Sequence, residues 1–225
     1  MASFQQHVNI SVIASGVLVV PLHSAGLLSI YESLVMLILG VVGGMLPDLD
    51  LDHSKPSQIF FRILSIFVPL MILLQFSEEV PVIQMMILWV IFGLFLHFVL
   101  RKTLAQMTTH RGIFHTIPMG ILFAQMALYT SQELLEQTVF VSSIVAFFIF
   151  FGFIIHLLLD EIYSVNFAGI QMKKSFGTAL KIYDKNNLIG TAILYILILV
   201  FLQYAPIESD IFIEILSILK DIKLF

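Results

Sequence analysis

The chain has 225 residues, of which 59% are apolar and only 12% charged, and its mean hydropathy is +1.02. Soluble domains carry about 25% charged residues, so this composition excludes an ordinary water-soluble globule and a disordered chain, and it predicts a protein of the lipid bilayer. Eleven Lys and Arg with a net charge of −4 argue against nucleic-acid binding. Cysteine is absent, which excludes disulfides and thiolate metal sites.

Continuous apolar stretches predict an all-α integral membrane protein, a bundle of six or seven transmembrane helices. The stretches cover residues 8–20, 28–46, 59–76, 82–100, 113–129, 139–159 and 188–204. Most could cross about 30 Å of hydrocarbon at about 1.5 Å per residue. The first is short unless residues 4–8 extend it, and the third, which contains Arg62 and Pro69, could be tilted, kinked or re-entrant. The runs do not alternate, which excludes a β-barrel.

One transmembrane domain is expected over residues 1–205, because no repeat or long linker interrupts the chain. No Lys or Arg precedes the first stretch, so it is interpreted as a retained helix and not as a cleaved signal. Residues 206–225 form a separate tail. Its polar residues recur at helical spacing among Ile, Leu and Phe, which predicts an amphipathic helix along the membrane interface, used for packing or solubility.

Most basic residues lie in or just after alternate connections between the stretches. Nine of the eleven follow this pattern: Lys55, Arg62, Arg101, Lys102, Arg111, Lys173, Lys174, Lys181 and Lys185. By the positive-inside rule, the even-numbered connections and the N-terminus face the cytoplasm.

Side chains that bind metals gather on this same cytoplasmic side. They are His7, Asp48, Asp50, Asp52, His53, His110, His115, His156 and Asp160. His23 lies on the opposite side, and His97 reads as an ordinary interfacial residue. Because the orientation was assigned from Lys and Arg alone, this clustering is a separate observation, and it predicts a single site.

The acidic run after the second stretch has two interpretations. Pro47 disfavours a helical conformation of the residue before it. If the following residues are extended, Asp48, Asp50 and Asp52 point to one side of the chain. Otherwise the run is a solvated acidic loop that follows the end of a helix.

The two histidines at the start of the fifth stretch are five residues apart. In one continuous helix their side chains would diverge by about 140°. They converge only if His110 lies in the loop and the helix starts near Gly112, with Thr108 or Thr109 as the cap. Arg111 suits recognition of a phosphate or carboxylate, or it is a membrane anchor.

In the sixth stretch, His156 and Asp160 are four residues apart and therefore share a helix face, either as metal ligands or as a hydrogen-bonded pair. In the second stretch, Gly40, Gly43 and Gly44 would let neighbouring helices approach closely.

These motifs resemble those of the membrane-bound, metal-dependent hydrolases, a family also described as LexA-binding, inner-membrane-associated hydrolases. The likeness rests on His7, on Leu-Pro-Asp-Leu-Asp followed by Ser in 46–54, on His-Arg-Gly-x-x-His-Thr in 110–116, and on His-x-x-x-Asp in 156–160. Residues 161–165 and 173–177 look like a bacterial branch of the family. The resemblance covers most of the first 165 residues and implies hydrolase activity. Asp52 and His53 depart from the family pattern, which leaves their role open.

Imidazole and carboxylate ligands without thiolates favour Zn²⁺ or Mn²⁺, as one or two ions. The expected ligands are His7, Asp48, His110, His115, His156 and Asp160. Asp50 would bridge two ions or act as the general base, and Arg111, Lys173 and Lys174 would hold an anionic group. The expected substrate is a phosphoester, either a small molecule or a lipid-linked compound, and the expected partners are membrane lipids.

Two other functions are consistent with the pattern. A metal transporter is less favoured, because transporters bind near the bilayer midplane and these residues stop at one face. A non-catalytic scaffold, whose metal site only ties helix ends together, would use the same residues.

Overall fold

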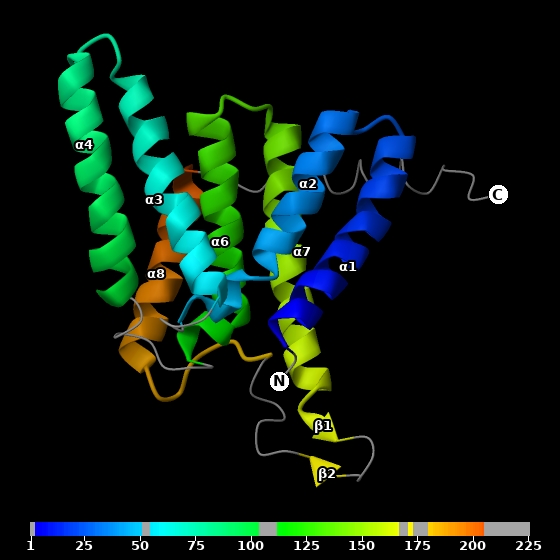
Figure 1. Cartoon of the computed structure of the whole chain (residues 1–225). Coiled ribbons are helices and arrows are strands. Elements are labelled where there is room, and N and C mark those ends of the chain that lie inside the picture. The colour runs from blue at the N-terminus through cyan, green and yellow to red at the C-terminus, as the bar shows by residue number, and fades with distance from the viewer. Residues whose placement is uncertain (1–2, 51–54, 104–111, 167–170, 173–179, 205–225) are drawn as a thin grey trace. The chain divides into compact units, whose positions relative to one another are not determined.

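The computed structural model describes residues 3–50, 55–103, 112–166, 171–172 and 180–204, and the α-helices of these residues form a helical membrane protein, as predicted (Figure 1). The chain divides into two compact units: Met1–Pro47 with Arg111–Phe225, and Asp48–His110. The predicted amphipathic helix of residues 206–225 lies outside the described residues.

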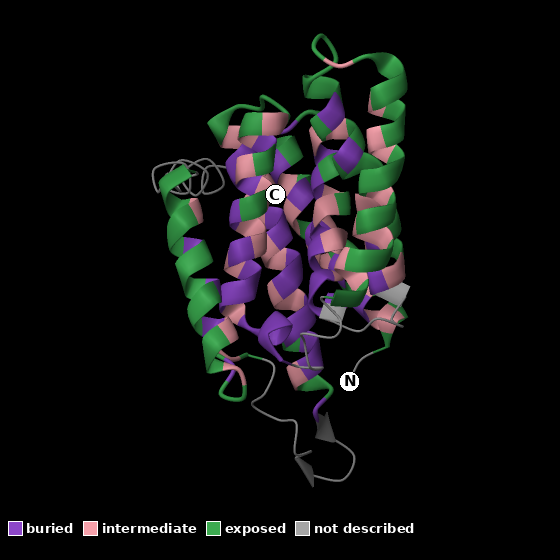
Figure 2. Cartoon of the chain, turned by 90° about the vertical axis from the view of Figure 1, so that its left-hand side faces the viewer, coloured by how far each residue is buried: buried purple, intermediate pink, exposed green. Residues whose placement is uncertain are grey.

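The first unit contains the larger helical bundle. Its elements are α1 (Phe4–Ser24), α2 (Ile30–Gly43), the 3-10 turn η3 (Ile113–His115), α6 (Ile117–Tyr129), the π-turn η4 (Thr130–Leu134), α7 (Val139–Ile162), a short antiparallel pair of strands β1 (Val165–Asn166) and β2 (Gln171–Met172), and α8 (Leu188–Tyr204). The helix α7 packs against α1, α2 and α6, and α8 packs against α6. In this unit, buried residues lie where helices face one another (Figure 2).

Polar caps define where the helices of this unit begin. Ser3 and Gln6 form a capping box, in which the Ser3 side chain accepts from the Gln6 amide and the Gln6 side chain accepts from the Ser3 amide. Ser29 and Glu32 do the same for α2. As a result α1 starts at Phe4, which extends the first apolar stretch to 21 residues.

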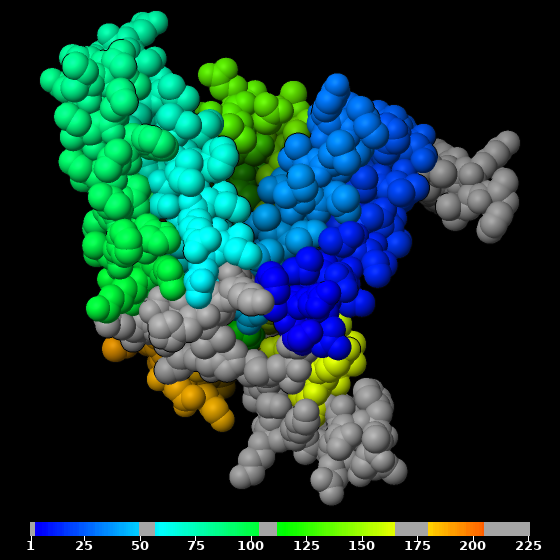
Figure 3. Space-filling model, viewed as in Figure 1, coloured from blue at the N-terminus to red at the C-terminus, as the bar shows by residue number. Residues whose placement is uncertain are grey.

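Glycines allow α1, α2 and α7 to touch through their backbones. A Cβ atom at Gly43 would collide with the carbonyl oxygen of Ile149, and one at Gly152 with that of Gly40. A Cβ atom at Gly44 would collide with the Ser11 hydroxyl. The expected close approach at these glycines is therefore confirmed, and the α1 and α2 surfaces run into each other without a break in Figure 3.

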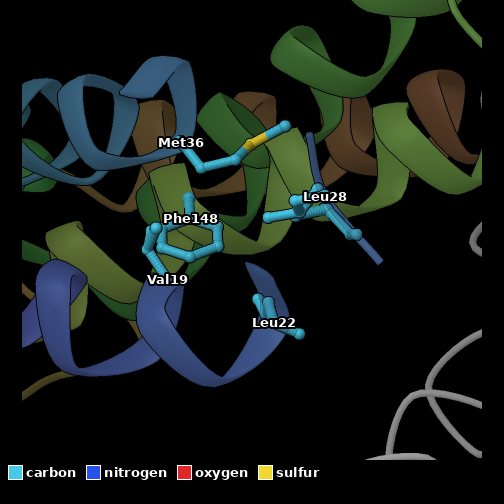
Figure 4. Close-up of a cluster of buried hydrophobic side chains, with 6 residues drawn as sticks. Val19, Leu22, Leu28, Met36 and Phe148 are labelled. Atoms are coloured by element: carbon cyan, nitrogen blue, oxygen red, sulfur yellow. The ribbon is translucent and has the colours of Figure 1, made fainter. Parts of the chain in front are cut away.

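A cluster of apolar side chains fills the space between the C-terminal half of α1, α2 and the first half of α7. It consists of Val19, Leu22, Leu28, Met36, Ile144 and Phe148 (Figure 4). Phe148 is completely buried. This cluster is one part of the apolar core of the first unit.

The second unit is a pair of helices. It contains α3 (Lys55–Gln75), α4 (Val82–Leu94) and the π-helical turn η2 (Phe95–Leu100), which extends α4. Trp89 Nε1 donates a hydrogen bond of 2.9 Å to the Ile66 carbonyl, and Gly93 lies against the Ser65 carbonyl. The third apolar stretch is thus one continuous helix that includes Pro69.

Helices of both units have the length and composition of membrane spans. Among the described residues, four qualify: Phe4–Ser24, Ser57–Gln75, Val82–Thr103 and Val139–Ile162, with Ile30–Gly43 and Leu188–Tyr204 as shorter apolar helices. Large apolar side chains such as Ile13, Val17 and Val20 are exposed along α1. An aqueous surface would not carry such a stripe, whereas hydrocarbon matches it.

Candidate metal centre

Three histidines and an aspartate meet inside the first unit. His7 comes from the first turns of α1, His115 from η3, and His156 and Asp160 from the C-terminal part of α7. The ends of α1 and α7 that carry them lie side by side in Figure 1. His115 and His156 are 0% exposed, Asp160 1% and His7 3%. The structure thus brings together four of the residues that the sequence analysis assigned to a single site.

The local sequence around each residue determines where its side chain points. His156 and Asp160 lie one helical turn apart in α7, so they project from the same face. His115 is the last residue of the turn η3. The next residue, Thr116, has an extended backbone conformation (φ −126°, ψ 146°). The Thr116 hydroxyl accepts a hydrogen bond from the Met119 amide and so caps the start of α6. This break separates the direction of His115 from the axis of α6. Thr116 caps α6, so the prediction that Thr108 or Thr109 would be the cap is wrong for this helix.

The Asp160 carboxylate lies between two imidazoles. Its Oδ1 is 3.5 Å from Nε2 of His7, and its Oδ2 is 3.8 Å from Nε2 of His115. Direct hydrogen bonds between such groups measure about 2.7–3.2 Å, so both distances are longer than a closed contact. A buried carboxylate is unfavourable without cationic compensation, which a bound cation would supply.

A backbone hydrogen bond fixes the orientation of His156. Its Nδ1 lies 2.7 Å from the carbonyl oxygen of Gly44. A carbonyl oxygen only accepts, so Nδ1 carries the hydrogen, and in the neutral ring the lone pair is then on Nε2. Ligating histidines commonly use one ring nitrogen to hold a carbonyl or carboxylate and the other to bind the metal.

The histidine rings also stack on each other. The rings of His7 and His156 are 3.8 Å apart and nearly parallel, at 11°. The His115 ring lies 5.6 Å from the His156 ring at 70°. The His7 and His156 rings are therefore in direct contact, and the three imidazoles form one compact group of nitrogen donors of the kind that binds metals.

The donor set fits a divalent cation. Two ligands about 2.0–2.2 Å from one tetrahedral ion lie about 3.3–3.6 Å from each other, close to the separations around Asp160. One ligand atom from each of His7, His156 and Asp160 lies within 4.8 Å of the others. Nδ1 of His7 is buried and has no hydrogen-bond partner among the described residues. The mixed nitrogen and oxygen set suits Zn²⁺ or Mn²⁺.

The remaining predicted residues lie outside the described part of the first unit. His110, Arg111, Lys173, Lys174, Asp52 and His53 lie outside the described residues. Asp48 and Asp50 belong to the second unit, as does His97, and each unit is described by itself. His23 lies near the other end of α1, where its Nδ1 is 2.8 Å from the Leu28 carbonyl.

The acidic run differs from one interpretation of the sequence. One interpretation of the sequence predicts an extended chain from Asp48 to Asp52, but Leu46–Asp50 forms a 3-10 turn, η1. Pro47 fits such a turn because its fixed φ of about −65° is also the 3-10 value. The two-residue alternation of an extended chain therefore does not apply to this segment.

Two polar groups next to the candidate metal centre could not be identified from the sequence. The Gly44 carbonyl, which orients His156, is a backbone group, and only the glycine itself marked a close approach. Ser11 lies one turn after His7, is completely buried, and its hydroxyl has no hydrogen-bond partner among the described residues. A single serine in an apolar helix gives no sequence signal that it is buried next to a cluster of histidines.

The chain matches a known family model. The model is described as YdjM inner membrane protein, and it matches residues 1–216. No curated protein and no solved structure matches the chain.

Proposed function

The chain belongs to the YdjM inner membrane protein family, and we propose that it is a membrane-bound, metal-dependent hydrolase that cleaves a phosphoester. One observation carries the proposal: the His7 and His156 imidazoles and the buried Asp160 carboxylate lie at the spacing of ligands around a single cation, and the His115 imidazole lies beside the same carboxylate. Membrane proteins rarely bury ionisable residues in this way without a function.

Each described residue has a stated part in this proposal. His7, His115, His156 and Asp160 hold the cation, and the Gly44 carbonyl keeps His156 in the tautomer that presents Nε2. A bound Zn²⁺ or Mn²⁺ supplies Lewis-acid chemistry that polarises a phosphoester and acidifies water. In the same proposal Asp48 and His110 complete the ligand set, and Asp50 is the general base.

The proposal also includes the side of the membrane on which the cluster lies and the class of substrate that it binds. The distribution of Lys and Arg puts the cluster near the cytoplasmic side of the inner membrane. Arg111, Lys173 and Lys174 then provide cations that recognise the phosphate group. The hydrolase part of the family resemblance enters this proposal, whereas LexA binding does not, because none of the residues argued above supports it.

Full burial of the cluster favours a second candidate, the metal-stabilised scaffold. His115 and His156 have no exposed surface, and a substrate has to reach a catalytic ion. In a scaffold, the same four ligands would fasten α1 and η3 to α7 and need no opening. Both candidate functions require the bound metal, and they differ only in whether the protein catalyses hydrolysis.

Metal content tests both candidates together. The purified protein in detergent is expected to retain about one or two equivalents of Zn²⁺ or Mn²⁺, measured by elemental mass spectrometry. His7→Ala is expected to lose most of it. The matched control, His23→Ala, changes a histidine of the same helix that lies apart from the cluster, and it is expected to retain the metal. Equal metal content in both variants would contradict the ligand set.

Turnover then separates the enzyme from the scaffold. The metal-loaded protein is expected to hydrolyse p-nitrophenyl phosphate or methyl p-nitrophenyl phosphate, and Asp160→Asn is expected to abolish the reaction. Metal-loaded protein that hydrolyses neither compound, nor any longer-chain ester, would favour the scaffold.

A further inference from the structure

We infer that a groove between α6 and α7 binds one hydrocarbon chain of the substrate, so that the substrate is a lipid phosphoester. The inference rests on the proposed function and assigns its substrate class. The groove is separate from the His and Asp cluster and consists entirely of residues of the first unit.

The groove is large enough for a ligand chain. Its volume is about 430 Å³, and it is lined by Ile121, Ala124, Gln125, Leu128, Ser143, Ala146, Phe147 and Phe150. Small-molecule sites have volumes of about 300–1,000 Å³. Ala124 on α6 and Ala146 on α7 are the small residues that leave this space open, whereas Phe147 and Phe150 provide flat apolar walls.

The lining chemistry selects hydrocarbon over other ligands. None of the lining residues is charged, and only Gln125 and Ser143 are polar. The α7 residues belong to a candidate membrane span, Val139–Ile162, so the groove faces the acyl-chain region of a bilayer. Polar ligands are rare in that region, whereas lipid chains are abundant, and a chain inside the groove gains close packing.

The groove is aligned with the metal centre. Phe150 precedes His156 by six residues on α7, and Ile121 lies in the first turns of α6, which begins just after His115. At about 1.5 Å per residue, α7 places the start of the groove about 9 Å along the helix from His156. A lipid with its phosphate at the cluster would therefore direct its chain toward the groove.

Gln125 keeps one wall of the groove in place. Its side chain is completely buried, and Nε2 donates a hydrogen bond of 3.3 Å to the Ile198 carbonyl of α8. This bond joins α6 to α8. The wall is thus fixed before any ligand binds, which lowers the entropic cost of binding.

Photocrosslinking tests the groove without requiring turnover. The probe is hexadecyl phosphate that carries a diazirine near the end of its chain, added at low molar ratio to the protein in detergent. Crosslinks are expected on the groove residues of α6 and α7, and unlabelled hexadecyl phosphate should compete. Ala124→Phe and Ala146→Phe, which fill the groove, should each lower the labelling by about tenfold. The matched control, Ala192→Phe, changes an exposed alanine of α8 and should not.

Kinetics provide the second measurement. Wild-type protein is expected to have a KM at least about tenfold lower for hexadecyl p-nitrophenyl phosphate than for the methyl ester, because only the longer chain reaches the groove. Ala124→Phe should remove this difference, whereas the control Ala192→Phe should retain both the difference and the rate with the methyl ester. Retained metal content shows that each variant is folded.

The possible failures are distinguishable. Labelling spread evenly over exposed apolar residues such as Ile13 and Val17, labelling confined to residues 205–225, or equal KM values for the two esters would overturn the inference and leave the hydrolase proposal intact. Groove labelling without hydrolysis of any ester would overturn the hydrolase proposal, and with it the assignment of a substrate.

Discussion

Toward the C-terminal end of α1, Val19 and Leu22 pack with Met36 of α2 and Phe148 of α7, whereas near its N-terminal end His7 lies against His156 and Asp160 of the same α7. Both places are buried, and both are formed by α1 and α7. The first contains apolar side chains, and the second contains three imidazoles and a carboxylate. The two ends therefore offer an internal comparison within one helix pair.

The interactions at the apolar end stabilise the helix packing, whereas those at the polar end suit the binding of an ion. Lipid is as apolar as a leucine side chain, so the apolar end is held mainly by van der Waals contact and by close backbone approach at glycines. The polar end loses hydration on burial and gains little packing. A cluster that contributes so little to stability by itself is best explained by an ion that it binds.

The largest expected effect is at the polar end. Asp160→Asn keeps the shape of the side chain but removes its charge, and it should lower metal affinity by more than about hundredfold, since loss of partners outside the ligand set already costs about 10–100-fold. Competition with a chelator of known affinity measures this. The exposed Glu133→Gln in η4 is the control and should retain full affinity.

Metal removal extends the same prediction. Chelation should lower the thermal unfolding midpoint of the wild type, because the ion binds only the folded protein. It should leave that of Asp160→Asn unchanged. A wild-type midpoint that does not respond to chelation would contradict the metal centre.

The next largest effect is at the apolar end. Phe148→Ala removes a completely buried ring and should lower the free energy of unfolding by about 3 kcal/mol, measured by titration with a denaturing detergent. The folded fraction should keep its full metal content. Joint loss of stability and metal would show that the two ends are not independent.

A smaller effect is expected at Thr116, which both begins α6 and follows His115. Thr116→Val removes the hydroxyl that accepts from the Met119 amide and should cost about 1 kcal/mol of stability. Thr116→Ser retains the cap and should restore stability. If Thr116→Val left the unfolding free energy unchanged, the cap would have no measurable role in positioning this segment.

The smallest effect is expected between the two ends. Ser15 is completely buried against Gly40, and its hydroxyl has no hydrogen-bond partner among the described residues. Ser15→Ala should leave stability unchanged or raise it by up to about 1 kcal/mol, because it removes an unsatisfied polar atom. Thermal unfolding measures this, and a clear loss of stability would show that the hydroxyl has a partner.

Much of the fold was predictable from sequence because each helix is encoded by its own residues. The stretch 188–204 coincides with α8, and Ser3 and Gln6 mark the start of α1 through a local capping box. Composition alone identified the membrane environment. These features depend on neighbours along the chain, so no knowledge of the tertiary structure was needed.

The site was predictable only where spacing decides geometry. His156 and Asp160 share a face of α7 because they are four residues apart. The conformation of Asp48 and Asp50 was not decided by the sequence, since Pro47 is compatible with both an extended chain and the 3-10 turn observed. The hydrogen bond from His156 to the Gly44 carbonyl depends on how α2 and α7 pack, and no local pattern contains that information.

X-ray absorption spectroscopy of the zinc-loaded protein tests the metal centre most directly. The account predicts a bound ion with at least two imidazole nitrogens at about 2.0–2.1 Å and one carboxylate oxygen, and it predicts loss of imidazole scattering in His7→Ala but not in His23→Ala. A protein that binds no zinc after purification, or a spectrum without imidazole scattering, would contradict it.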